Sequence, residues 1–211
     1  MVTKRFPVIP SLILALTILT GCLTYGAFNT QAFAINYSAG TYGSCTYNTC
    51  SISLTSNGII SVNVTPSASS PTCSVTSDSV TATTDSSTGY TITMTDSDTS
   101  NLMIGPAAST IAAGSGTPAS PAVLTTNTWG YRVDSISGFG AGPTAVVTNG
   151  SIPSLTFAAL PLSSGTPSLI RTTSTADTGS VSTPVWYGVC VNSSLTGGSY
   201  SDSVTYTALI N

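Results

Sequence analysis

The chain is poor in the side chains that carry acid–base chemistry. It has 211 residues and no histidine, and the segment from Ile35 to Asn211 also lacks lysine and glutamate. The ionisable side chains of that segment are seven aspartates, two arginines, four cysteines and the tyrosines. A serine nucleophile needs a neighbouring base, and neither His nor Lys is there to act as one. The composition therefore argues against an enzyme, and we expect neither catalysis nor a cofactor.

Positive charge is equally scarce. Arg132 and Arg171 are the basic residues of the segment 35–211. Nucleic-acid binding requires Lys and Arg to displace counterions from phosphates, so this class of partner is excluded. Attraction to acidic membrane surfaces depends on basic clusters as well. We expect contact with a membrane only through the N-terminal segment or a lipid on Cys22.

Little charge of either sign is available for the surface. The sequence is 41% hydrophobic and 5% charged, and Ser and Thr make up roughly a third of it. A chain of this length can bury a sizeable core, and its polar surface must consist of hydroxyls and amides. We expect residues 35–211 to form one domain.

The N-terminus has the features of an export signal. Lys4 and Arg5 precede the short apolar run Leu12–Leu23, and Gln31–Ala34 ends in the small-x-small pattern that a signal peptidase cuts. These features predict a signal peptide, with a signal helix, at residues 1–34. The expected location is extracellular or at the cell surface.

Cys22 offers an alternative to that cleavage. Leu19–Cys22 matches the lipobox of bacterial lipoproteins, in which the Cys is lipidated and becomes the mature N-terminus. If it is used, residues 23–34 become a tether. An uncleaved anchor is a third possibility, but a run of about a dozen residues falls short of the ~20 that span a bilayer.

The remaining cysteines form an even set, as in exported proteins with disulfides. Three pairings of Cys45, Cys50, Cys73 and Cys190 are possible, and we favour Cys45 with Cys50 and Cys73 with Cys190. The second pair would tie an early strand to a late one. Without His and without paired CxxC spacing, the cysteines do not predict a zinc site.

Most of the segment alternates apolar and polar residues, which is typical of half-buried strands. Asn57-Gly58, between two such stretches, predicts a two-residue hairpin. In the last stretch, Tyr200–Ile210, alternate residues from Tyr200 to Ile210 share one face. The pattern predicts an all-β fold, a disulfide-stabilised antiparallel sandwich of Ig-like or WxL-like type. The other expected strands are Ile60–Val64, Ser79–Thr83, Tyr90–Thr95, Trp129–Val133, Leu155–Phe157, Leu169–Thr172 and Val185–Val191.

Four segments carry a resemblance that covers most of the chain after the signal: Gly89–Met94, Asn127–Arg132, Val185–Val189 and Gly198–Thr207. Together they resemble secreted surface proteins of ultra-small, host-dependent candidate-phylum bacteria such as the Saccharibacteria. This resemblance implies a setting, the cell surface, and no particular mechanism.

Two segments are similar to the WxL domain of Gram-positive cell-surface proteins. Tyr90-Thr91-Ile92 and Tyr206-Thr207-Ala208 occupy places comparable to its two Trp-x-Leu segments, with Tyr in place of Trp in both. Since WxL domains associate non-covalently with the cell wall, the resemblance implies wall binding.

Three groups of residues could form chemical sites. Asp177-Thr178-Gly179-Ser180 matches the aspartic-protease motif, but it has no second copy, and we interpret it as a surface turn. Asp96–Ser100 has alternating oxygen ligands, but it lacks the Gly and Glu of an EF-hand loop; a solvated turn is the default, and no metal is expected. The candidate ligand-binding residues are the aromatic side chains beside the irregular stretch 138–150, namely Trp129, Tyr131 and Phe139, which could form an exposed platform. The alternation favours the other interpretation, in which most aromatic side chains pack between the sheets.

We therefore expect a secreted structural or adhesive module of the cell surface, without catalysis. Its partners would be the cell wall, or a glycan or protein of a host surface. A wall- or glycan-binding module of WxL type is the first alternative. An aspartic-type hydrolase built by dimerisation through Asp177 is the second.

Overall fold

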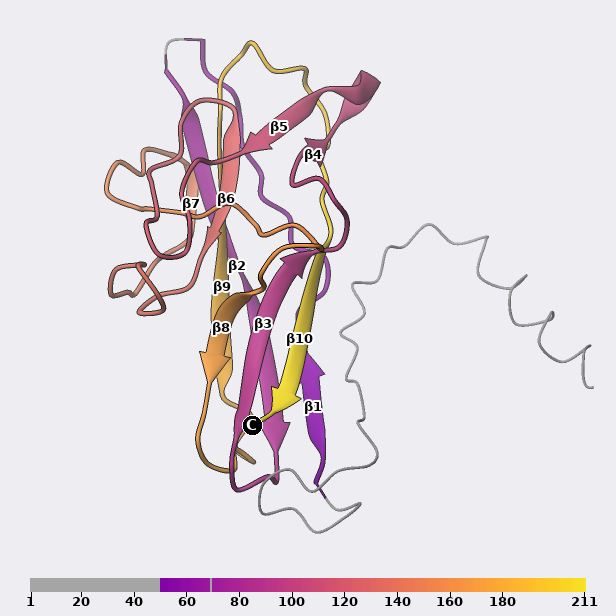
Figure 1. The fold of residues 1–211 in the computed structure, drawn as a ribbon. Coiled ribbons are helices and arrows are strands. Elements are labelled where there is room, and N and C mark those ends of the chain that lie inside the picture. The colour runs from indigo at the N-terminus through magenta and orange to yellow at the C-terminus, as the bar shows by residue number, and fades with distance from the viewer. Residues whose placement is uncertain (1–49, 69) are drawn as a thin grey trace, which may run out of the picture.

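The computed structural model describes residues 50–68 and 70–211, and the expected signal peptide, Cys22 and Cys45 lie outside them. Ten strands and one short 3-10 helix, η1 (Pro106–Ala108), make up the regular structure (Figure 1). No helix of the described part is long and apolar enough to cross a membrane. The strands are β1 (Ile52–Thr55), β2 (Thr72–Thr84), β3 (Tyr90–Asp96), β4 (Met103–Ile104), β5 (Thr110–Ala113), β6 (Thr128–Arg132), β7 (Val147–Gly150), β8 (Ser168–Thr172), β9 (Ser182–Val191) and β10 (Val204–Ile210).

The strands form two sheets. The larger, curled sheet has the order β1-β2-β9-β6-β5-β4, and β7 pairs with the start of β2, at the opposite end from β1. The smaller sheet has the order β10-β3-β8 and is antiparallel throughout. In Figure 1 the small sheet lies in front of the lower part of β2 and β9. The all-β prediction is thus confirmed.

The large sheet departs from the antiparallel expectation at one place. β5 and β6 pair in parallel, with Ala112 opposite Thr128 and Ala113 opposite Trp129. Parallel neighbours need a long connection, and residues 114–127 supply it. The sheet is therefore mixed.

The hairpin predicted at Asn57-Gly58 is not formed. β1 pairs with the far end of β2, Ile52 opposite Thr84, rather than with the residues that follow Gly58. A type I′ turn requires positive φ at both central residues, and of the two only Gly58 has it. The Asn57 N–H is held instead by Asp78 Oδ1 at 2.8 Å. Residues 60–64, an expected strand, belong to neither sheet.

The two sheets share one hydrophobic core, built from the inward positions of their strands. β3 shows the pattern most clearly: Tyr90, Ile92 and Met94 are buried and the residues between them are half-buried. Tyr206 and Ala208 of β10 are buried too, as the shared face predicted for the last strand requires. A smaller cluster surrounds the disulfide and includes Phe157.

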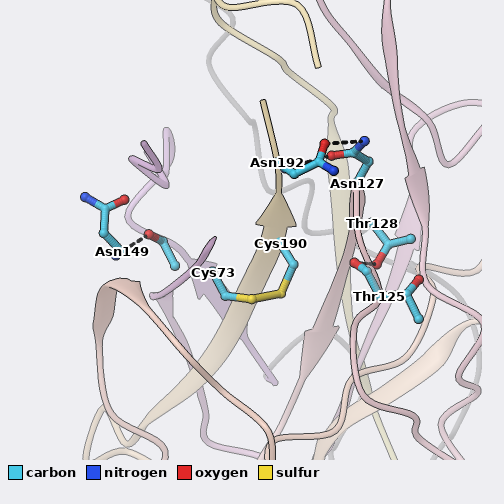
Figure 2. The surroundings of a disulfide bond; sticks show 8 residues. Cys73, Thr125, Asn127, Thr128, Asn149, Cys190 and Asn192 are labelled. Carbon is cyan, nitrogen blue, oxygen red and sulfur yellow. Dashed lines mark hydrogen bonds between the residues drawn. A yellow bond between two sulfur atoms is a disulfide. The ribbon is translucent and has the colours of Figure 1, made fainter. Parts of the chain in front are cut away.

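The Cys73–Cys190 disulfide joins β2 to β9 (Figure 2). The two cysteines lie directly opposite each other in the ladder, with Cα atoms 4.1 Å apart, although 117 residues separate them in sequence. Beside it, Asn127 and Asn192 exchange hydrogen bonds, Asn192 N–H donating at 3.1 Å and Asn127 Nδ2 at 3.3 Å. The predicted pairing is confirmed. Cys50 is also in a disulfide, and Cys45, its predicted partner, lies outside the described residues.

Removing the long-range disulfide should be strongly destabilising. The Cys73→Ala/Cys190→Ala variant frees a loop of 117 residues in the unfolded chain, and we expect a loss of about 4–5 kcal/mol in the free energy of unfolding. Urea unfolding of the non-reduced protein measures it, since the second disulfide then stays intact. An unfolding midpoint equal to that of the wild type would show that the β2–β9 ladder does not need the bond.

A hydrogen bond joins the two sheets through the core. The hydroxyls of Tyr187 on β9 and Tyr206 on β10 are 2.6 Å apart, and the Tyr187 hydroxyl also lies 3.5 Å from Met94 Sδ. Burial is the main reason why the pKa of each phenol is raised, so both stay protonated. The pair therefore fixes the spacing of the sheets with neutral groups.

We expect Tyr187→Phe and Tyr206→Phe each to lower the free energy of unfolding by about 1 kcal/mol, because each removes the hydrogen bond between the two hydroxyls. The double variant should lose clearly less than the sum of the two. A double-mutant cycle in urea measures this coupling. Strictly additive losses would mean that the two hydroxyls do not stabilise each other.

Candidate functional site

A cleft of about 770 Å³ opens beside the core, above the small sheet. Two irregular segments far apart in sequence line it, Gly58–Pro66 after β1 and Leu195–Ser203 before β10. Buried apolar side chains of the core line it as well: Ile111, Trp129, Val189, Val191 and Tyr206. We call this cavity the cleft.

The first of these segments keeps the alternation of a strand without being part of a sheet. Ile60, Val62 and Val64 are half-buried, whereas the residues between them are exposed. Its ends are tethered: Asp78 Oδ1 accepts the Asn57 N–H, and Asn149 Oδ1 accepts the Thr65 N–H at 2.6 Å. The segment is thus held in place by its two ends and by its apolar face.

Three aspartates line the cleft: Asp78, Asp98 and Asp202. Asp78 is 3% exposed and projects from β2 on the same face as Val80 and Ala82. Asp202 lies just before β10, on the side of the chain that also carries Val204 and Tyr206. Two inward-facing aspartates, Asp78 and Asp202, and the exposed Asp98 thus make the cleft acidic. No basic residue lines it among the described residues.

Asp202 has the most strongly perturbed carboxyl group. Burial, followed by the charges of Asp96 and Asp98, raises its pKa to about 7, although the Ser203 N–H donates to its Oδ1 at 2.8 Å and opposes the shift. Its Oδ2 is buried and has no hydrogen-bond partner. Near neutral pH this carboxyl group is therefore partly protonated and poorly satisfied.

Asp96, the last residue of β3, is a second buried acidic residue near Asp202. It is 1% exposed, its Oδ2 also lacks a partner, and burial raises its pKa. Its Oδ1 accepts the Asp98 N–H at 3.0 Å, and Asp98 Oδ1 accepts the Ser100 N–H at 2.7 Å. These bonds form the turn expected at 96–100, but the turn begins in the core rather than in solvent. Within the described residues, no three His, Cys, Asp or Glu side chains are grouped so that they could hold a metal ion.

The aromatic residues predicted to bind a ligand are buried instead. Trp129 is 3% exposed, Tyr131 0% and Phe139 5%, and the last two meet edge to face at a centroid distance of 5.6 Å. These rings do not form an exposed platform, and they pack in the core as the alternation favours. Trp129 alone lines the cleft, with its indole N–H donating to the Asn101 carbonyl at 3.0 Å.

Asp177, of the protease-like motif, forms hydrogen bonds and an ion pair with groups of the same chain. Its Oδ2 accepts the Tyr90 hydroxyl at 3.1 Å and lies 3.4 Å from Arg171, and its Oδ1 accepts the Gly179 N–H at 3.3 Å. The backbone of Asp177 pairs with Thr84 at the end of β2. This arrangement fits the turn predicted there and gives the residue a structural role.

Comparison of the chain with models of known families, with curated proteins and with solved structures finds no significant match. The function therefore has to be argued from the cleft itself.

Sequence reasoning missed Asp78 and Asp202, although a signal was present. Each lies at a position of its strand-like stretch whose side chain faces inward, where an apolar residue is expected. Asp78 is two residues before Val80, and Asp202 is two residues before Val204. A charged residue on the buried face is unusual, and it marks a functional candidate when the chain has few charges.

The raised pKa of Asp202 predicts a pH dependence of stability. Since the pKa is about 3.9 in an unfolded chain and about 7 in the folded protein, folding favours the protonated form. The contribution is complete below pH ~4 and is lost as the pH rises through ~7. We expect Asp202→Asn to stabilise the protein at pH 8 by on the order of 1–2 kcal/mol, a value reduced for partial exposure, and to change little at pH 4.

Thermal unfolding between pH 4 and pH 8 measures this effect. Asp85→Asn is the matched control, because Asp85 is exposed and its Oδ1 also accepts one backbone N–H, that of Ser51. If Asp202→Asn leaves the pH profile as steep as in the wild type, another group is responsible for it.

Proposed function

We propose that this protein is an exported, non-catalytic module of the cell surface that acts in adhesion or surface structure and binds its partner in the cleft. The observation that carries the proposal is the cleft itself. Its volume of about 770 Å³ lies in the range of ligand-binding cavities, and it combines apolar core side chains with a few converging polar groups. Its partner would be a wall component, or a glycan or protein of a host surface.

Two observations support the setting. The Cys73–Cys190 disulfide suits an oxidising compartment, and the export features at the N-terminus agree with it. The two facing sheets suit a rigid scaffold for display, which we infer to be a sandwich of Ig-like or WxL-like type.

The non-catalytic part of the proposal rests on the scarcity of suitable groups. The cleft offers carboxyl groups and the phenols of Tyr187 and Tyr206, whose pKa values are raised by burial. With neither His nor Lys in the segment 35–211, a hydroxyl nucleophile has no nitrogen base. Weak affinity per site would be multiplied where many copies are displayed on one cell.

Wall binding of WxL type is the alternative, and one observation favours it. The segments Tyr90–Ile92 and Tyr206–Ala208 lie on the neighbouring strands β3 and β10, with Ile92 opposite Ala208. Two motifs far apart in sequence thus meet in one small sheet. Both tyrosine rings are buried there, so the contact with wall would come from the surface around them.

Filling the cleft should abolish binding. Leu195 lines the cleft, so Leu195→Trp occupies part of its volume, whereas Leu209→Trp adds the same bulk at a position on β10 that is 46% exposed and does not line the cleft. In pull-downs of the full chain on purified cell wall, immobilised glycans and host-surface proteins, we expect Leu195→Trp to weaken binding at least tenfold and Leu209→Trp to leave it unchanged.

Equal binding by both variants would place the site elsewhere on the surface, and absence of binding to all three materials would overturn the adhesive role. Turnover of a bound glycan, lost in Asp202→Asn, would overturn the non-catalytic part. A carboxyl group with a pKa of about 7 is able to act as a general acid.

A further inference from the structure

The segment Ile59–Val64 is strand-like, but within the described residues its backbone pairs with no strand. We call it the unused edge. Its side chains alternate between exposed and half-buried positions, as is typical of an extended backbone. Its backbone N–H and C=O groups nevertheless form no hydrogen bond in the described part of the chain, where the bonds of this region begin at Asn57, Gly58 and Thr65. Six residues in this conformation present about 20 Å of unpaired backbone.

The topology leaves room beside this edge. β1 and β10 are neighbours, yet no hydrogen-bonded ladder joins them. Above them the chain continues as Ile59–Val64 after β1 and as residues 199–203 before β10, and both segments line the cleft. Figure 1 shows β1 and β10 side by side at the lower right, with nothing bridging their upper ends in a ladder. The open space beside Ile59–Val64 is the cleft itself, between this segment and residues 199–203.

The charge of the cleft selects the occupant. Asp78, Asp98 and Asp202 line it, no basic residue does, and Asp202 Oδ2 is buried without a partner. A buried carboxylate oxygen of this kind is costly unless a cation or a donor meets it. A basic side chain carried by the occupant would supply both.

A second copy of this chain does not fit that requirement. The basic residues of the segment 35–211 are Arg132 and Arg171, and each is already in an ion pair, Arg132 with Asp134 at 2.8 Å and Arg171 with Asp177 at 3.4 Å. The other basic residues of the chain, Lys4 and Arg5, belong to the expected signal peptide, so the charge of the cleft favours an occupant from another protein.

We propose that the cleft binds an extended peptide segment of another protein, which adds a strand along Ile59–Val64, places apolar side chains at alternate positions against the core, and sets a Lys or Arg beside Asp202. The proposal rests on the cleft being the binding site. Of the partner classes in the proposed function, it selects a protein. The main-chain amides of a peptide are spaced to pair with an unpaired strand edge, whereas the polar groups of a sugar are not.

The test uses the full chain and synthetic eight-residue peptides in which Val alternates with Thr and one terminal residue is Lys. Two further peptides carry N-methyl groups on alternate amides, one on the odd and one on the even positions. A strand added to an edge pairs through amides of one parity only. We therefore expect one N-methylated peptide to bind at least tenfold more weakly by calorimetry and the other to bind like the parent.

Two readouts locate the peptide. Hydrogen exchange of the amides of 59–64 should slow when the parent peptide binds, since free N–H groups become paired. Replacing the peptide Lys by Gln should weaken binding about tenfold in the wild type and hardly at all in Asp202→Asn. Asp85→Asn, which alters an exposed carboxyl group, should keep the full effect of the Lys.

Three results would overturn the inference: no peptide binds, both methylation patterns weaken binding equally, or 59–64 remains unprotected in the complex. Failure of the proposed function is recognised separately. If Leu195→Trp still abolishes binding to wall or glycan while the peptides fail, the cleft is a binding site for a different class of partner. If Leu195→Trp changes nothing on any surface, the cleft is not the site.

Discussion

The pairing of β2 with β9 is the interaction on which the rest of the structure depends. Thr72–Thr81 runs antiparallel to Ser182–Val191 without a break, and the Cys73–Cys190 bond closes one end of this ladder. Every other strand of the large sheet attaches to one of the two strands, directly or through β6. The small sheet adds its own layer through the core and the hydrogen bond between Tyr187 and Tyr206. Without this ladder neither side of the cleft would have support.

Periodicity predicted most of this scaffold and little of the site. The strands expected at 90–95 and 169–172 are β3 and β8 almost to the residue, because alternation reports which side of a strand is buried. The same signal predicted a strand at 60–64, where burial alternates but no strand of the described residues pairs with the segment. Alternation does not report pairing. The Asn57-Gly58 signal failed for a related reason, since β1 pairs with the distant end of β2 rather than with the residues after Gly58.

The aromatic candidates lie in the core because burying hydrophobic surface there stabilises the fold more than leaving it beside a loop. Tyr131 and Phe139 are large, and burying them stabilises the fold by a few kcal/mol. The site instead uses aspartates, of which Asp78 and Asp202 occupy inward positions and Asp98 is exposed. We propose that a positively charged partner offsets the cost of placing three carboxyl groups around one cavity.

The scarcity of lysine bears on the same point. Natural sheets protect their free edges with lysines, bulges or covering segments, because an unpaired edge recruits other strands. From Ile35 onward this chain has no lysine to use in that way. β10 is covered by its neighbour β1, whereas 59–64 keeps its backbone unpaired inside an acidic cleft. Negative charge around that edge repels acidic chains and admits basic ones, so the unused edge becomes selective rather than aggregating. In our proposal, the buried carboxyl group of Asp202 lowers the stability of the fold and in return favours basic partners over acidic ones.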